Sequence, residues 1–216
     1  TFIFVGEVAR RHPEVVARIA AEGHELGCHS DSHIPLDRLG RAGFRDDLLR
    51  NLDALRAAGA GGIRGYRAPC FSMIAGTGWA YEVLAELGFS YSSSVLPARS
   101  PLYGDPGFGT APRLIDGIVE LPVTLLPFRL LPVPIGGLYF RILPRPILRR
   151  ALKERRRRGE AVASYHHPYD IDTEQSFTHA GFRRWGAFDL LMRANRKSVL
   201  PRLEAVRSLG FPFAPY

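Results

Sequence analysis

Two histidines four residues apart form the first group of side chains in this sequence that could do chemistry. His29 and His33 enclose Ser30-Asp31-Ser32, directly after a short apolar stretch. Imidazoles at this spacing can face one metal ion, either on a helical turn or in a tight loop. Zn²⁺ would be typical with nitrogen and oxygen ligands, and Co²⁺, Ni²⁺ and Mn²⁺ are alternatives. The competing interpretation is two unrelated surface histidines, because this spacing by itself is common. If both rings converge on one ion, Asp31 should point elsewhere.

A second group follows an expected strand that ends at Tyr66. It reads Arg67-Ala68-Pro69-Cys70-Phe71-Ser72. The planar guanidinium of Arg67 can hold a carboxylate through two hydrogen bonds. Pro69 stiffens the turn and leaves the Cys70 N–H able to point into a site, where it could stabilise an oxyanion. The alternative is a capped loop that carries a surface arginine.

A third group, Tyr165-His166-His167-Pro168-Tyr169-Asp170-Ile171-Asp172, follows an expected strand over residues 161–165. A histidine at a strand end is a ready general acid, because imidazole titrates near neutral pH. We expect His167 to be that acid, since the following Pro168 holds its backbone extended. The alternative is a pair of loop histidines without a catalytic role.

Short apolar runs alternate with amphipathic stretches along the whole chain. They predict strands over residues 1–5, 24–28, 63–66, 89–95, 118–121, 161–165 and 211–214, and helices over 8–21, 44–58, 78–87, 146–158 and 197–208. The segment Pro97–Pro112 is rich in proline and glycine and predicts a long loop. Alternating strands and helices are typical of an α/β fold with parallel strands. In barrels of this kind the chemistry lies at the carboxyl ends of the strands, where all three groups fall.

Composition sets broad limits on the class of protein. The chain has 216 residues, of which 46% are hydrophobic and 23% are charged, enough for one sizeable domain with a full core. Its two cysteines, Cys28 and Cys70, are too few for a disulfide scaffold. No apolar run reaches the roughly 18 residues expected of a membrane span. The sequence leaves the compartment open between cytoplasm and cell envelope.

A basic cluster carries much of the formal net charge of +8. It lies in Arg149–Arg158. One interpretation is the solvated face and basic end of a helix, which the helix dipole favours. The other is attraction to anionic lipid head groups or to an acidic glycan. Nucleic acid is not an expected partner, because the basic residues are not interleaved with aromatic side chains that could stack on bases.

Taken together and in this order, the three groups resemble the polysaccharide deacetylase family, also called carbohydrate esterase family 4 or the rhizobial chitooligosaccharide deacetylase homology domain. Thr1–Gly6 is similar to the family's ATFFVLG strand, and His12–His29 is similar to its HPELV…GHEIGSH stretch. Arg67–Pro69 matches the RxP motif. His167–Asp172 and Gly137–Arg141 resemble the HPWEID and GGGYFR of the branch associated with exopolysaccharide and exosortase gene clusters. The resemblance covers nearly the whole chain, so residues 1–216 are expected to form one domain.

The resemblance implies a fold and a role for each matching residue. The implied fold is a distorted (β/α) barrel of about seven parallel strands. The implied site consists of the metal ligands His29 and His33, the base-orienting Arg67, the oxyanion-hole N–H of Cys70, the substrate-pocket residues Phe71 and Tyr165, and the general acid His167. The implied reaction is metal-dependent removal of N-acetyl groups from a polysaccharide or amino-sugar polymer, so an N-acetylated glycan is the expected partner.

Two rival functions share this fold. One is a hydrolase of small cyclic amides or ureides, which would need a closed pocket rather than an open groove. The other is a non-catalytic glycan-binding or scaffold domain that has lost the catalytic base. The presence or absence of that base separates the enzyme from the scaffold.

Two departures from the family pattern bear on this choice. The family's TFDDG motif supplies an aspartate base and an aspartate metal ligand, and the resemblance places it upstream of the strand at Thr1. We therefore expect this chain to lack both aspartates and the first barrel strand, and to show little activity by itself. Asp46-Asp47 does not fit as a replacement, because it lies inside an expected helix. In addition, Ser92 stands where relatives have an aspartate that assists the catalytic histidine, and Asp170 is a candidate substitute.

Overall fold

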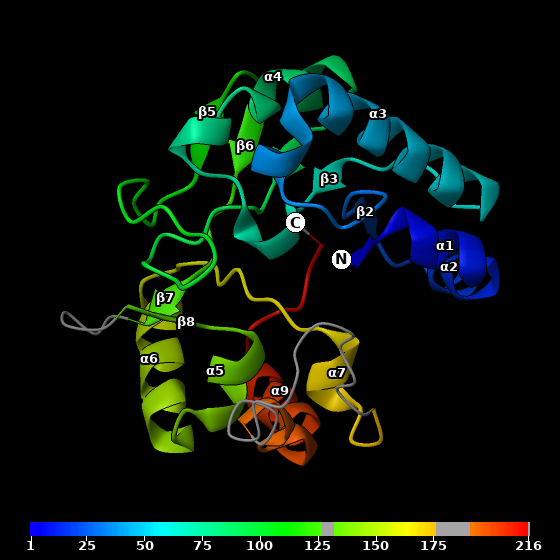
Figure 1. Cartoon of the computed structure of the whole chain (residues 1–216). Helices are drawn as coiled ribbons and strands as arrows, with labels where there is room; N and C mark the ends of the chain where they lie inside the picture. Colours follow the sequence, from blue (N-terminus) through cyan, green and yellow to red (C-terminus); the bar gives the residue numbers. More distant parts are fainter. Residues whose placement is uncertain (127–131, 176–190, 216) are drawn as a thin grey trace. The chain divides into compact units, whose positions relative to one another are not determined.

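A computed structural model describes residues 1–126, 132–175 and 191–215 of the protein (Figure 1). The chain forms two compact units. The first comprises Thr1–Val123 with the last residues from Ala214 onward, and the second comprises Thr124–Phe213. Each unit buries its own cluster of apolar side chains.

A six-stranded sheet forms the centre of the first unit. Its strands are β1 (Phe2–Phe4), β2 (Leu26–Cys28), β3 (Gly65–Tyr66), β4 (Tyr91–Ser92), β5 (Arg113–Ile115) and β6 (Ile118–Glu120). They lie in the order β1-β2-β3-β4-β6-β5 and are parallel, except that β5 pairs antiparallel with β6 at the edge. This is the α/β arrangement with a mostly parallel sheet that the sequence predicts.

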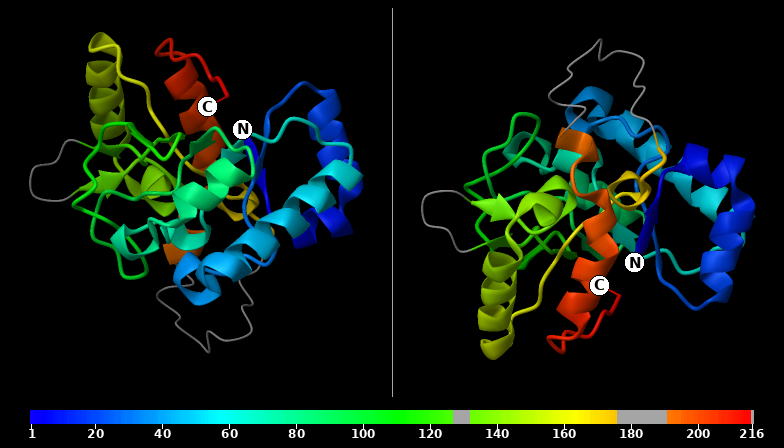
Figure 2. Two further views of the ribbon diagram at one scale, coloured as in Figure 1. Left: turned by 90° about the horizontal axis from the view of Figure 1, so that it is seen from above. Right: turned by 90° about the horizontal axis from the view of Figure 1, so that it is seen from below.

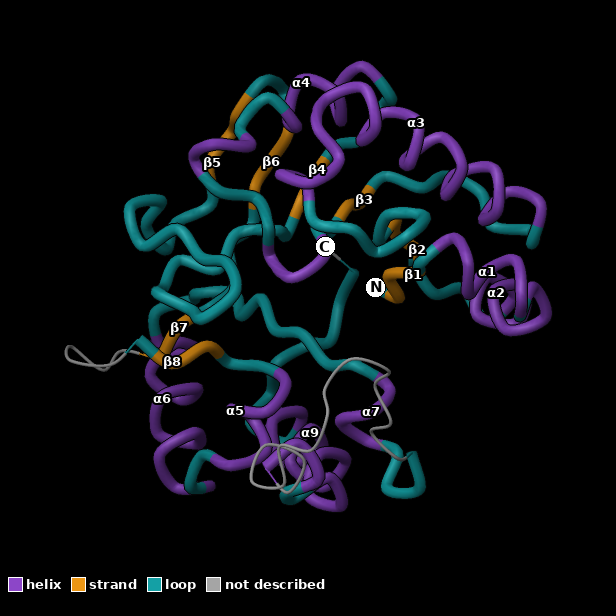
Figure 3. The backbone as a smooth tube through the Cα atoms, viewed as in Figure 1, coloured by secondary structure: helices purple, strands orange, loops and turns teal. Residues whose placement is uncertain are grey.

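The strand register sets where the following loops begin. It aligns the last residues of the five parallel strands in one row, namely Phe4, Cys28, Tyr66, Ser92 and Glu120. The strands are short. β2, β3, β4 and β6 continue into loops, whereas β1 leads into α1 after one residue (Figure 3). Because parallel strands point the same way, these loops start side by side at the carboxyl edge of the sheet.

Helices cover the sheet of the first unit. They are α1 (Gly6–Arg11), α2 (Pro13–Ala21), α3 (Leu36–Ala57) and α4 (Ala80–Glu86), with short 3₁₀ turns η1 (Pro69–Phe71) and η2 (Ala75–Thr77). The long helix α3 contacts α1, α2, α4 and β2, and α1 and α2 lie beside it in both views of Figure 2. Its buried apolar residues Phe44, Leu48, Leu52 and Leu55 recur every three or four positions, the spacing of an amphipathic helix.

The second unit is built mainly from helices. Its elements are the antiparallel pair β7 (Leu125–Leu126) and β8 (Val133–Pro134), and the helices α5 (Gly137–Ile142), α6 (Arg145–Arg157), α7 (Pro168–Ile171), η3 (Arg196–Ser198) and α9 (Val199–Arg207). Leu148 and Leu152 of α6 pack with Val199 of α9 and with Phe140 of α5 in its core. A single parallel bridge joins Gly136 to Tyr165.

Two predicted helices have different limits in the structure. The stretch predicted over residues 8–21 is two helices, because Pro13 lacks the N–H that would continue the hydrogen bonds of α1. The helix predicted from Phe44 begins at Leu36, and it contains a break at Gly40, whose φ is 65°. Glycine tolerates that left-handed value without steric cost, so the chain can turn there and resume the helix. The predicted helices over residues 78–87, 146–158 and 197–208 correspond to α4, to α6, and to η3 with α9.

Two predicted strands are not strands in the structure. Residues 161–165 form only the bridge at Tyr165, because Ala163 instead exchanges hydrogen bonds with Thr124, so the segment follows no one partner strand. Residues 211–214 make no ladder, and Pro212 cannot donate to one. Five strands of the described residues are therefore parallel in one sheet, fewer than the seven expected. In the same part of the chain, no helix is both long and apolar enough to cross a membrane.

Candidate functional site

The loop after β2 carries His29 and His33. Hydrogen bonds from His29 N to Phe4 O (2.9 Å) and from Arg67 N to Cys28 O (3.0 Å) fix this loop between its two neighbours. The imidazole rings of His29 and His33 lie edge to face, with centroids 4.8 Å apart. The structure therefore brings together the two side chains that the sequence predicts as metal ligands.

One hydrogen bond determines which nitrogen of His29 can bind a metal. Its Nδ1 lies 2.7 Å from the backbone oxygen of Arg67. A carbonyl oxygen only accepts, so Nδ1 must donate, and the lone pair of the neutral ring is then on Nε2. Metal-binding histidines typically have their second nitrogen anchored in this way.

A buried carboxylate on α3 shapes the loop between the two histidines. Asp47, which is fully buried, accepts hydrogen bonds from Ser30 Oγ (2.6 Å), Asp31 N (2.6 Å), Ser32 N (3.2 Å) and Ser32 Oγ (2.6 Å). Ser30 and His33 both have positive φ, of 70° and 56°. Left-handed conformations are unfavourable for such residues, and the anchor on Asp47 offsets that cost.

A second anchor ties the loop to β1. Asn51, one helical turn after Asp47, donates from Nδ2 to Phe4 O (2.8 Å) and Ser30 O (2.7 Å). Asp31 points away from the histidines, as predicted. Its carboxylate pairs with Arg10 at 2.6 Å and with Arg50 at 3.4 Å, which leaves it poorly placed to act as a base.

Arg67 emerges from the neighbouring strand β3. Its Nε donates to Ser93 O (2.7 Å) and its Nη2 to Ser93 Oγ (2.8 Å), so the loop after β4 holds the guanidinium in place. The guanidinium carbon lies 5.9 Å from the centroid of the Phe71 ring. The side chains of Arg67 and Phe71 therefore lie next to each other beside the histidine loop, which bonds to the Arg67 carbonyl.

The turn after Arg67 has an unusual backbone at two successive residues. Cys70 and Phe71 have φ values of 56° and 58°, both left-handed. The N–H groups of Phe71 and Ser72 bond to Ala68 O and Pro69 O, whereas no described residue accepts a hydrogen bond from the Cys70 N–H. Burial raises the pKa of the Cys70 thiol, which disfavours a thiolate nucleophile. This leaves the backbone N–H of Cys70 as the group at this position that can donate a hydrogen bond.

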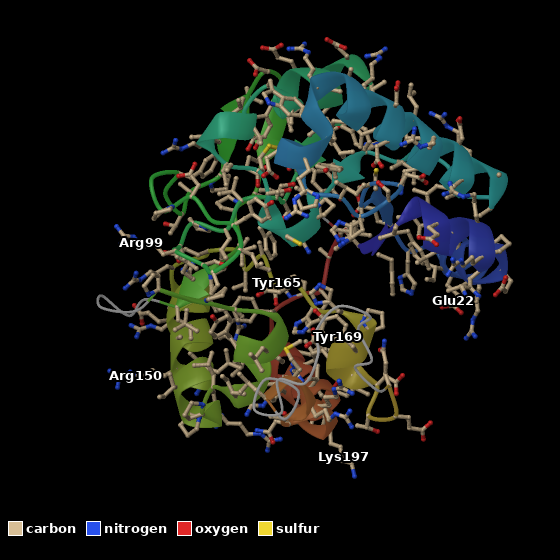
Figure 4. All side chains as sticks on the ribbon, in the orientation of Figure 1. Glu22, Arg99, Arg150, Tyr165, Tyr169 and Lys197 are labelled. Carbon is tan, nitrogen blue, oxygen red and sulfur yellow. The ribbon has the colours of Figure 1, made fainter. Side chains whose placement is uncertain are left out.

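The second unit carries the histidine pair predicted to contain the general acid. His167 precedes α7 and is partly exposed, and its ring stacks on that of Tyr169 in α7, with centroids 4.5 Å apart. Tyr169 and Tyr165 are labelled in Figure 4. His166 instead packs edge-on against Phe140 in the same unit, and its Nε2 lies 3.2 Å from Ser164 Oγ. Of the two rings, His167 is the one available for chemistry at the surface of this unit.

Two groups surround His167. The Tyr165 ring, predicted to line the substrate pocket, lies edge-on to it at 5.9 Å. The Asp170 carboxylate lies 3.3 Å from its Nδ1 and accepts its backbone N–H at 2.8 Å. Burial by itself would raise the pKa of Asp170, but the hydrogen bonds from His167 and the charges of His167 and Arg141 outweigh this, so the pKa is lowered.

The site residues thus fall into two groups, one in each unit. The first unit brings together His29, His33, Arg67, Cys70 and Phe71, and the second brings together Tyr165 and His167. Among the described residues, no three His, Cys, Asp or Glu side chains are grouped to hold a metal, so this part of the chain supplies two histidines toward one.

Sequence reasoning missed the residues that support the site. Asp47 and Asn51 follow the same periodicity as the buried leucines of α3, so their helical phase was a usable signal for buried polar side chains. Arg141 gave no such signal, because an arginine in a short helix is normally exposed.

Two family models divide almost the whole chain between them. The model for "Polysaccharide deacetylase" matches residues 1–91, and that for "Domain of unknown function (DUF3473)" matches residues 93–211, more than half of the chain. The chain belongs to the polysaccharide deacetylase family. Its second family region, DUF3473, contains both Tyr165 and His167.

Curated relatives of this family member match it over a limited region. A peptidoglycan-N-acetylglucosamine deacetylase from Bacillus cereus is 38% identical over 60 residues, which are 27% of this chain and 22% of the relative. A chitooligosaccharide deacetylase from Bradyrhizobium sp. is 36% identical over 58 residues, which are 27% of this chain and 26% of the relative. The matches thus span about a quarter of each relative's length.

Solved structures support the fold of this family member. A Mycobacterium smegmatis protein classed among the polysaccharide deacetylases aligns with a TM-score of 0.58 and 22% identity, covering 100% of this chain and 75% of that one. A family 4 carbohydrate esterase from Streptomyces lividans aligns with a TM-score of 0.51 and 16% identity, covering 94% and 71%. The predicted fold class is confirmed by these likenesses.

Proposed function

We propose that this protein is a metal-dependent hydrolase that removes N-acetyl groups from a polysaccharide or amino-sugar polymer. The observation that carries the proposal is the pair of facing imidazoles, with the Nδ1 of His29 anchored on the Arg67 carbonyl. The family supports the class of reaction, and the two curated relatives are named for N-acetylated glycans. An N-acetylated glycan of an exopolysaccharide or cell envelope is the corresponding substrate.

The donor set suits a divalent metal, with Zn²⁺ first and Co²⁺, Ni²⁺ or Mn²⁺ as alternatives. His29 and His33 would hold it through ring nitrogens. In the proposal the remaining protein ligand and the base are the aspartates of the family's TFDDG motif. When bound, the metal polarises the acetyl carbonyl and lowers the pKa of a water.

The chain's own residues then have distinct roles. Arg67, already fixed by Ser93, would orient the carboxylate of the base. The N–H of Cys70 would donate to the oxyanion of the tetrahedral intermediate. His167 would give a proton to the departing nitrogen as the C–N bond breaks, so that amide and water become a free amine and acetate. Phe71 of the first unit and Tyr165 of the second would each contact the substrate.

The basic helix α6 is the basis for a second proposed contact, with an anionic polymer or anionic lipid head groups. Its buried residues Leu148, Ala151 and Leu152 face the core, while Arg149 and Arg150 are exposed. Arg150 is labelled in Figure 4. Such a face would attract an anionic polymer or anionic lipid head groups. Charge reversal of both arginines should weaken binding to anionic vesicles or an acidic glycan, and unchanged binding at low salt would contradict this role.

Metal content tests the metal site in the full-length protein. His29→Ala and His33→Ala should each abolish stoichiometric metal and deacetylation of N-acetylated chitooligosaccharides. His12→Ala, which removes an exposed imidazole on the same unit, is the matched control and should change neither. Retention of the metal in both site variants would contradict the assignment of His29 and His33 as metal ligands.

Kinetics test the general acid. His167→Ala should lower kcat by about 10²-fold or more, in line with general acid catalysis, and leave metal content unchanged. His166→Ala should mainly reduce stability, because that ring packs on Phe140. If His166→Ala abolished turnover and His167→Ala did not, the proton donor would be the other histidine.

A further inference from the structure

Asp170 carries a fully buried carboxylate, and two of its contacts go to His167. Its Oδ2 accepts the backbone N–H of His167 at 2.8 Å and lies 3.3 Å from Nδ1 of the same residue. Its Oδ1 lies 3.1 Å from Nε of Arg141, whose side chain is also fully buried. A carboxylate from the first turn of α7 thus holds both the backbone and the ring of His167.

We propose that Asp170 is the positioning residue of His167, taking the role that the family pattern gives to an aspartate at the position of Ser92. The catalytic consequence of this proposal rests on the proposed deacetylase function, whereas its structural part does not.

The chemistry follows from the atoms in contact. An ionised carboxylate can only accept, so the facing Nδ1 must carry a hydrogen. The proton that His167 gives up is then the one on Nε2, and no described residue is bonded to that nitrogen. When Nε2 donates its proton to the departing amine nitrogen, the C–N bond breaks and the ring remains neutral with hydrogen on Nδ1. A neutral ring with hydrogen on Nε2 alone would instead turn the lone pair of Nδ1 towards the Asp170 carboxylate, which is unfavourable in this pose.

Arg141 makes a charged Asp170 tolerable in the interior. Its Nη1 donates to Met192 O (2.8 Å) and Ala194 O (3.2 Å), so the guanidinium is fixed between α5 and the segment before η3. The Nε–Oδ1 contact lacks hydrogen-bond geometry and acts through charge. A buried carboxylate without such a counter-charge would strongly favour its neutral form, which accepts the Nδ1 hydrogen more weakly.

Ser92 is engaged elsewhere. Its side chain is fully buried, its Oγ lies 2.6 Å from Ser94 Oγ, and it is also hydrogen-bonded to Glu120. These contacts belong to the strand ends of the first unit. The Ser92 hydroxyl therefore belongs to a local hydrogen-bond network at the strand ends. In the proposal, Asp170 on α7 supplies the carboxylate that family relatives carry at the position of Ser92.

A purely structural role for Asp170 must be separated from this one. The bond from His167 N to Asp170 is part of a capping box at the start of α7, which would exist without any catalysis. The contact that goes beyond capping is the one to Nδ1. The decisive readout is therefore the tautomer of the ring rather than stability alone.

The experiment compares Asp170→Asn with wild type in the full-length protein. Histidine-selective ¹⁵N NMR at alkaline pH reports the tautomer of each neutral imidazole, and His167→Gln assigns the signal among the seven histidines. Wild type should show hydrogen on Nδ1 of His167. In Asp170→Asn the amide oxygen should face Arg141 and the NH₂ should face Nδ1, so the ring should shift towards hydrogen on Nε2. The kcat on N-acetylated chitooligosaccharides should fall at least tenfold, with KM and metal content unchanged.

Two further variants complete the test. Asp172→Asn is the matched control, since that exposed residue accepts N–H bonds that an asparagine can also accept. It should keep the wild-type tautomer and kcat. Asp170→Glu should restore the Nδ1 hydrogen and part of kcat.

Each outcome has a defined meaning. An Asp170→Asn protein with the wild-type tautomer and wild-type kcat would overturn the proposal. If Asp170→Asn does not fold, the NMR spectrum of the wild-type protein decides the question. A His167 ring with hydrogen on Nε2 would then overturn the proposal. If wild type deacetylates no glycan but the tautomer follows Asp170, the proposed function fails and the positioning role stands.

Discussion

The histidine loop should depend on one buried carboxylate, and Asp47→Ala tests this dependence. The change removes the acceptor of four hydrogen bonds. The buried N–H of Asp31 would then lose its partner at a cost of about 1–3 kcal/mol. The partly exposed N–H of Ser32 adds about 1 kcal/mol, and the two hydroxyls, which can turn to other acceptors, add about 0.5–1 kcal/mol each. The free energy of unfolding should fall by about 3–6 kcal/mol.

Urea unfolding followed by circular dichroism measures this loss, and Asp46→Ala provides a matched control. Asp46 is the exposed neighbour of Asp47 on the same helix, so its removal should change stability by less than about 0.5 kcal/mol. Asp47→Asn keeps the shape but turns an amide towards some of the donors, so an intermediate loss is expected. In the full-length protein Asp47→Asn should also weaken metal binding by about tenfold or more, because residues that orient metal ligands have effects of that size. If Asp47→Ala and Asp46→Ala had the same free energy of unfolding, the hydrogen bonds to Asp47 would not stabilise the protein, and the prediction would be refuted.

Three further changes test other parts of the structure. Gly65→Ala should destabilise the protein by about 1–3 kcal/mol, because a Cβ there would meet the Tyr91 ring, whereas Gly61→Ala has open space and should be nearly neutral in thermal denaturation. Glu120→Ala should cost about 3–5 kcal/mol in urea unfolding, since two backbone N–H groups and a tyrosine hydroxyl lose a buried acceptor, and a loss below 1 kcal/mol would show that water replaces it. Asp170, whose pKa is lower in the folded state, contributes stability above its unfolded pKa of about 3.9 and loses it as the pH falls through the lower folded value. Asp170→Asn should therefore flatten the acid fall in the free energy of unfolding below about pH 4, and an unaltered pH profile would contradict that linkage.

The sequence by itself determined the fold class and the family, and it predicted a short list of site residues. Alternating apolar runs and amphipathic stretches are local patterns, and they indicated the five parallel strands of the sheet and the positions of α4 and α6, but also two strands that do not form. The two imidazoles of His29 and His33 could be paired from their spacing, because residues four apart in a tight loop necessarily lie close together. Element limits were less certain, since Pro13 and Gly40 alter helices through single-residue backbone properties.

Only the tertiary structure decided how these residues are held. The row from Phe4 to Glu120 places the loops after successive strands side by side, and strand register depends on pairing between segments distant in sequence. The capture of the histidine loop by Asp47 depends on how α3 packs on the sheet. The failure of residues 161–165 to form a strand has the same origin, because backbone hydrogen bonds go to whichever partner packing supplies. Arg141 and Asp170 pair in the interior for a similar reason: a buried charge is tolerated only where the folded chain brings an opposite charge to it.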